Sequence, residues 1–137
     1  MSNIMSHVRE AALRGEAGSQ FNLGIYYDNG LDDNGHAADR DRREAIKWLR
    51  KAADQGLARA QCKLAEIFTE ESDLKRAYAW FLVATASSDG ANGQQVRARM
   101  DRLESKLTDE QIGLAKKLAR TWAAKIRAGS RDGASPA

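Results

Sequence analysis

Residues 41–56, DRREAIKWLRKAADQG, have the spacing that decides the fold. Small and large apolar side chains recur there every three or four positions, which is the period of one helix face; they are Ala45, Trp48, Leu49, Ala52 and Ala53. Asp41 can cap the N-terminus, with Glu44 three residues later, and Gly56 stands where helices often end in a left-handed conformation. The stretch therefore predicts an amphipathic helix over 41–55 that packs against two neighbours.

This pattern returns 32 residues later, at 73–88, and the preceding segment, 17–28, returns 41 residues later, at 57–69. The first match pairs Ala45, Trp48, Leu49 and Ala52 with Ala77, Trp80, Phe81 and Ala84; the second pairs Ala17, Gln20, Leu23, Gly24 and Tyr27 with Ala58, Gln61, Leu64, Ala65 and Phe68. The offsets differ because the loop inside the second unit is shorter, and loop length changes closure entropy only slowly. Repeated helix pairs predict an all-α solenoid.

We predict one repeat domain over residues 1–128, with about six helices in a right-handed solenoid. Its parts are an N-terminal half-repeat at 3–15, repeat one at 17–56, repeat two at 57–90 and C-terminal capping helices over 91–127. Thr108 and Gln111 have the spacing of a capping box at the start of the last helix. Residues 129–137 have nothing apolar to bury, so we expect a disordered tail there.

The repeated residues resemble the Sel-one-like repeat family, a branch of the tetratricopeptide superfamily. That family has an A-x-x-Q-x-x-L-G-x-x-Y helix, a glycine loop and a K-A-x-x-W-x-x-K-A-A-x-x-G helix. The chain matches with Ala17, Gln20, Leu23, Gly24, Tyr27 and Gly30, then Ala45, Trp48, Lys51, Ala52, Ala53 and Gly56. The second unit departs by carrying Ala65 in place of the glycine. The resemblance, which extends to the C-terminal capping end common in bacterial members, implies a non-catalytic adaptor that binds another protein.

Several functional classes find no support in the sequence. No apolar run approaches the 18 residues of a membrane span, and the N-terminus lacks the apolar core of a signal peptide. We expect a cytoplasmic protein, or a periplasmic one if a leader has been removed. Cys62 is the only cysteine, and neither His7 nor His36 forms a nucleophile–base motif with it. We predict no enzymatic activity, no cofactor and no resident metal.

The polar loop over residues 28–40 leaves two interpretations open. Its carboxylates, among them Asp28, Asp32 and Asp33, are the ligand type that Ca²⁺ prefers, although the EF-hand spacing is missing. The other interpretation is a solvated insertion, which on a rigid scaffold can also contact a partner.

The predicted concave face supplies the candidate partner site. The first helix of each pair lines that side of a solenoid, so the positions of 17–28 and 57–69 that do not pack should face a groove. An apolar patch followed by carboxylates is suited to a short helix or extended segment that carries a basic residue. The alternative is that the apolar members pack under the N-terminal helix. The predicted partner-binding residues are Phe21, Ile25, Asp28, Arg59, Glu66, Thr69 and Glu70, with Cys62 on the same stripe.

The uneven charge supports a second functional hypothesis. The net charge is −2 over residues 1–90 and +5 over 91–137, and the last helix carries Lys116, Lys117, Arg120, Lys125 and Arg127. Such a helix could contact nucleic acid or another acidic partner, but base-stacking sites also need exposed aromatics. The three tryptophans occupy predicted core positions, which disfavours nucleic acid. The expected partner is a protein or peptide, and the expected state is a monomer or a weak homo-oligomer.

Overall fold

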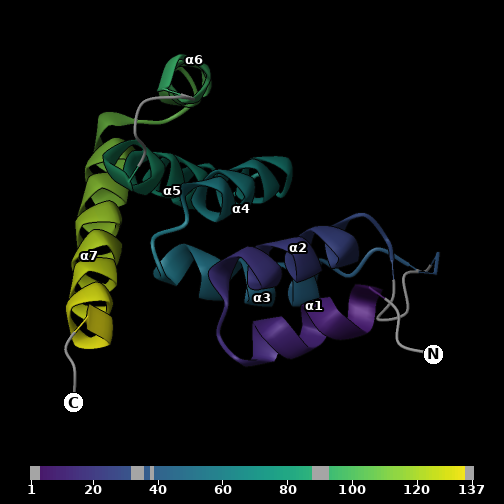
Figure 1. Ribbon diagram of the computed structural model, residues 1–137. Coiled ribbons are helices and arrows are strands. Elements are labelled where there is room, and N and C mark those ends of the chain that lie inside the picture. Colours follow the sequence, from purple (N-terminus) through teal and green to yellow (C-terminus); the bar gives the residue numbers. More distant parts are fainter. Residues whose placement is uncertain (1–3, 32–35, 38, 88–92, 135–137) are drawn as a thin grey trace.

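The computed structural model describes residues 4–31, 36–37, 39–87 and 93–134, and these ranges are helical apart from loops and one isolated bridge (Figure 1). The helices are α1 (Ile4–Leu13), α2 (Ala17–Asp28), α3 (Arg42–Asp54), α4 (Ala58–Glu70), α5 (Leu74–Ser87), α6 (Gly93–Glu104) and α7 (Asp109–Ala134). The bridge joins Leu31 to Ala37 in the α2–α3 loop. The all-α prediction is confirmed, with seven helices in the described ranges against an expectation of about six.

The helices form a stack of pairs. Helix α1 packs on α2, α2 pairs with α3, α4 pairs with α5, and α3 contacts α4 between the two pairs. The long α7 lies against α5 and also touches α3, whereas the main contact of α6 is with α5. In Figure 1, α6 lies at the top of the molecule and α1 at the bottom right, and α7 runs down the left-hand side. This is the solenoid of helix pairs that the repeat predicts.

The core consists of the positions that the repeat aligns. In α3 the residues with no exposed surface are Ala45, Leu49, Ala52 and Ala53, and the α5 counterparts of the first three, Ala77, Phe81 and Ala84, are also buried. Trp48 is buried too, but it packs in a smaller cluster with Ala12 and Leu23 next to α1. The alanines keep the helices close together, so the larger side chains fill the remaining space.

The predicted helix ends are confirmed where a capping residue marks them. The Asp41 carboxylate accepts a hydrogen bond from the Glu44 N–H at 3.1 Å, and Gly56 has a φ of +92°. At the start of α7, the Thr108 hydroxyl accepts a hydrogen bond from the Gln111 N–H at 3.1 Å. The Gln111 side-chain oxygen in turn accepts one from the Thr108 N–H at 2.9 Å. These local bonds satisfy donors at the first turn that have no partner inside the helix.

Helices α2 and α3 approach most closely at Gly24. A Cβ atom at this position would lie 2.7 Å from Cγ of Leu49 and 3.2 Å from the carbonyl oxygen of Ala45. The nearest side chain to this glycine is therefore Leu49, although Trp48, which precedes Leu49 in the sequence, is the larger residue. Trp48 points toward the cluster beside α1, so Leu49 occupies the space that the missing side chain leaves.

Replacing Gly24 by alanine should lower the free energy of unfolding by about 1–3 kcal/mol, because the added methyl group overpacks the α2–α3 contact. This loss would come despite a gain of about 1 kcal/mol in helix propensity. Urea denaturation followed by circular dichroism measures it. Gly113→Ala in α7 is the matched control: nothing lies within 4 Å of its Cβ position, so alanine should stabilise the protein. Equal stabilisation by both substitutions would contradict the close packing at Gly24.

The C-terminal boundary differs from the prediction. Helix α7 continues through Ala134, so a helix ending at 127 and a disordered tail from 129 are wrong for the residues up to 134. The physical reason is that Gly129 weakens a helix by only about 1 kcal/mol, and Pro136 is the first residue that strongly opposes continuation. Residues 135–137 of the predicted tail lie outside the described residues.

Candidate interaction groove

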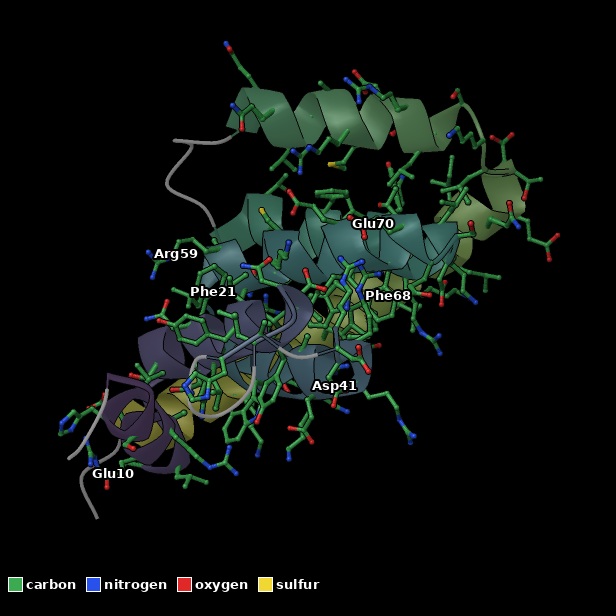
Figure 2. The ribbon with its side chains drawn as sticks, turned by 90° about the vertical axis from the view of Figure 1, so that its right-hand side faces the viewer. Glu10, Phe21, Asp41, Arg59, Phe68 and Glu70 are labelled. Carbon is green, nitrogen blue, oxygen red and sulfur yellow. The ribbon has the colours of Figure 1, made fainter. Side chains whose placement is uncertain are left out.

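The predicted partner-binding residues come from α2 and α4, and the structure divides them into two groups. Phe21, Ile25 and Arg59 form the first group, with the Arg59 guanidinium 5.2 Å from the centre of the Phe21 ring. Figure 2 shows Arg59 beside Phe21, with Glu70 farther along α4. The second group, toward the C-terminal ends of α2 and α4, consists of Asp28, Glu66, Thr69 and Glu70.

Phe21 and Ile25 are half-buried and pack against the main hydrophobic cluster, which is built largely from α3, α4 and α5. The cluster next to the N-terminal helix instead contains Ala12, Leu23 and Trp48. The alternative that Phe21 and Ile25 pack under that helix is therefore wrong. Part of each side chain stays accessible beside α4.

Asp28 is not available to a partner, which corrects its predicted role. Its side chain is only 2% exposed and contacts three cations of the same chain. The Nε atoms of Arg40 and Arg42 lie 3.1 and 2.9 Å from Oδ1, and Nζ of Lys63 lies 3.2 Å from Oδ2. Through these ion pairs, Asp28 at the end of α2 holds both the end of the α2–α3 loop and helix α4 in place. It would not serve as a Ca²⁺ ligand in this arrangement.

The cations keep this carboxylate ionised. Burial by itself would raise the pKa of Asp28, but hydrogen bonds from Arg42, Arg40 and Lys63 outweigh it and hold the pKa below its ordinary value. A buried carboxylate with its oxygens bound in this way is stable only while those partners stay in place.

The pairing extends across the surface of both repeats. Arg42 bonds Glu70 and lies 2.8 Å from Glu71, while Lys63 lies 3.9 Å from Glu66. Glu66 is also bonded by Arg99 of α6. We call this set the inter-repeat ion network; it contains Asp28, Arg40, Arg42, Lys63, Glu66, Glu70, Glu71 and Arg99. The hydrogen bond from Arg42 lowers the pKa of Glu70.

A groove of about 490 Å³ opens between α4 and α6, and we call it the α4–α6 groove. Three of the predicted partner-binding residues, Glu66, Thr69 and Glu70, line its α4 side. The rest of the lining is Phe81 from α5, with Arg99, Arg102, Leu103 and Lys106 from α6 and the turn after it. Sequence reasoning missed this second wall. The excess positive charge of the C-terminal third was the available signal, but it was assigned to the last helix.

Cys62 lies near this groove but has the surroundings of an unreactive thiol. It is half-buried, and burial together with the Glu66 carboxylate raises its pKa, which keeps the thiol protonated. Among the described residues, no three histidine, cysteine or acidic side chains gather as metal ligands. Residues 32–35, where most of the predicted Ca²⁺ ligands fall, lie outside the described part of the chain.

The tryptophans pack as the sequence predicts. Trp48 and Trp80 are buried, and Trp80 stacks on Trp122 with ring centres 4.4 Å apart. The Arg50 guanidinium lies 5.0 and 5.2 Å from the centres of these two rings. The cations Lys116, Lys117 and Arg120 lie on an exposed face of α7, in a shallow hollow that they share with Glu110 and Leu114.

None of the helices in the described ranges combines the length and apolar character of a membrane span. A comparison with curated protein sequences finds no match. Among solved structures, the chain is similar to c5321, described as a protective antigen present in uropathogenic Escherichia coli strains that displays an SLR fold. The two share 30% sequence identity and superimpose with a TM-score of 0.73.

That alignment covers 97% of this chain but only 28% of c5321, so the chain spans about a quarter of that protein's length. The Sel1 repeat model matches residues 17–57 and 58–89, which together are more than half of the chain. These two segments are the α2–α3 and α4–α5 pairs, whose core positions and helix ends follow the repeat pattern. The chain therefore belongs to the Sel1 repeat family.

Proposed function

We propose that this protein is a non-catalytic scaffold that binds another protein through the α4–α6 groove. The family supports this function, because stacked helix pairs present extended surfaces that are suited to protein contacts. The groove itself is the observation that carries the proposal. It is a hollow of about 490 Å³ between two helices, with apolar side chains at its base and polar ones around it. Such a surface suits a helical or extended segment of a partner.

The proposed contact surface keeps six of the seven residues chosen from the sequence. Glu66, Thr69 and Glu70 line the groove, and the accessible parts of Phe21, Ile25 and Arg59 continue the surface along α2 and α4. Asp28 is left out because its carboxylate is buried in the ion network.

Filling the groove should abolish partner binding. Thr69→Trp places a bulky neutral side chain at an exposed position of the groove wall, and it should reduce the recovery of a bound protein by about tenfold or more. Affinity capture from a lysate of the source organism, quantified by mass spectrometry, measures this. Thr121→Trp is the control, because Thr121 is also exposed on a helix and also donates its hydroxyl hydrogen bond to the carbonyl four residues earlier.

If Thr69→Trp and Thr121→Trp retain the same proteins at the same level, the groove is not the binding surface. The second candidate function, contact with nucleic acid, predicts a different result. Binding through phosphates should weaken steeply as salt rises from about 50 to 200 mM and should be lost in Lys116→Glu/Lys117→Glu. Recovery of nucleic acid alone, removed by nuclease treatment, would contradict the scaffold function.

A further inference from the structure

Both carboxylates that line the α4–α6 groove are already paired within the protein. Glu66 is bonded by Arg99, and Glu70 is bonded by Arg42. Arg40 approaches the same Glu70 oxygen to 3.4 Å. A basic residue of a partner would have to displace these bonds. The groove therefore has little net attraction for a cationic segment, although its α4 wall alone looks acidic.

The opposite wall carries positive charge that has no counterpart. Arg102 and Lys106 line the groove, both are exposed, and neither forms an ion pair with any residue in the described ranges. They stand four positions apart, with Leu103 between them. Because the internal pairs cancel, these two cations set the sign of the potential in the groove.

The base of the groove is apolar. Phe81 and Leu103 line it, and each has no more than 3% of its surface exposed. Because so little of either side chain is accessible, the base offers a partner little apolar contact, and the charged wall has to supply the attraction. A nucleobase would need an accessible aromatic face for stacking, and the Phe81 ring, which is 1% exposed, provides none. The chemistry at the base thus favours a protein segment over a nucleic acid.

We infer that the α4–α6 groove binds an acidic protein segment, whose carboxylates pair with Arg102 and Lys106. This inference rests on the proposed scaffold function and specifies the partner's chemistry. It reverses the charge that the sequence suggested, because the α4 carboxylates are satisfied internally and the cations of the second wall are not.

The test uses the full chain and short fluorescein-labelled peptides that share one apolar core and have glutamate, glutamine or lysine flanks. Fluorescence anisotropy should show the glutamate-flanked peptide binding about tenfold or more tightly than the lysine-flanked one. Arg102→Glu/Lys106→Glu should reverse this order. Lys116→Glu/Lys117→Glu makes the same charge change on α7 and should leave the order intact. Circular dichroism verifies that both variants remain folded.

Equal or tighter binding of the lysine-flanked peptide to the native chain would overturn the inference while leaving the scaffold function in place. So would an oligonucleotide that binds more tightly than the acidic peptide and depends on Arg102 and Lys106. If no peptide binds, a photo-crosslinker introduced at Thr69 decides the matter in the source lysate. A crosslinked acidic segment supports the inference, a basic or neutral one refutes it, and no crosslinked protein refutes the scaffold function as well.

Discussion

Asp28→Ala should lower the free energy of unfolding by about 3–5 kcal/mol, as expected when one partner of a buried ion pair is removed. The substitution leaves Arg40, Arg42 and Lys63 facing each other without the carboxylate that neutralises them. The loop before α3 and helix α4 should both loosen from the end of α2. Guanidinium or urea denaturation measures the loss.

Asp54→Ala is the matched control for this prediction. Asp54 pairs with Arg50 at 3.0 Å, but both side chains are exposed, so its removal should cost less than about 1 kcal/mol. A similar small loss for both variants would show that the pairing at Asp28 contributes no more than a surface salt bridge. Asp28→Ala/Lys63→Ala should recover part of the stability, because fewer uncompensated charges remain.

The same carboxylate gives the expected pH dependence. The folded-state pKa of Asp28 lies below its ordinary value of 3.8, so its contribution is fully present above that pH and is lost as the pH falls through the folded-state value. Glu70, whose pKa is also lowered, acts in the same direction. The difference in stability between the native chain and Asp28→Ala should therefore narrow below about pH 4.

Trp80→Ala should destabilise the protein by about 3–5 kcal/mol, the range for truncating a buried aromatic residue. Trp80 is 1% exposed and stacks on Trp122, so its removal opens a cavity between α5 and α7. Urea denaturation measures the global loss, and limited proteolysis should show earlier cleavage within α7. A loss below about 1 kcal/mol would mean that α7 does not depend on this contact.

Trp122→Ala provides the comparison, because Trp122 remains partly exposed and its truncation should cost less. The double variant then isolates the stacking energy, which should be about 0.5–1.5 kcal/mol. Full additivity of the two single losses would contradict the stacked geometry. Tryptophan fluorescence is unsuitable as the only probe here, since both substitutions remove fluorophores, so circular dichroism should report unfolding.

The repeat pattern predicted the helices, their register and most of the core. Ala45, Leu49 and Ala52 are buried because a helix puts every third or fourth residue on one face, whatever it later packs against. The caps at Asp41 and Thr108 also depend only on near neighbours in the chain. The side chain nearest to Gly24 does not follow from such local spacing, since whether Leu49 or Trp48 lies closer depends on how two helices cross.

The candidate site divides in the same way. The helix period placed Glu66 and Thr69 on one side of α4, and both do line the groove. The helix period also placed Asp28 on that surface. It could not show that Arg40 and Arg42, which follow the loop in the sequence, pack against this carboxylate in the folded chain. The ion pairs of the network join residues from different helices and loops, so no local spacing predicts them.

By itself, the sequence determined the helical repeat, the family and the positions that pack, because these follow from periodicity along one chain segment. Only the tertiary structure decided which charges in the groove remain free. Arg99 of α6 and Arg42 of α3 neutralise the carboxylates of α4, while Arg102 and Lys106 keep their charge without an ion-pair partner in the described ranges. Net charge at a site depends on distances between segments, and those distances exist only in the folded chain.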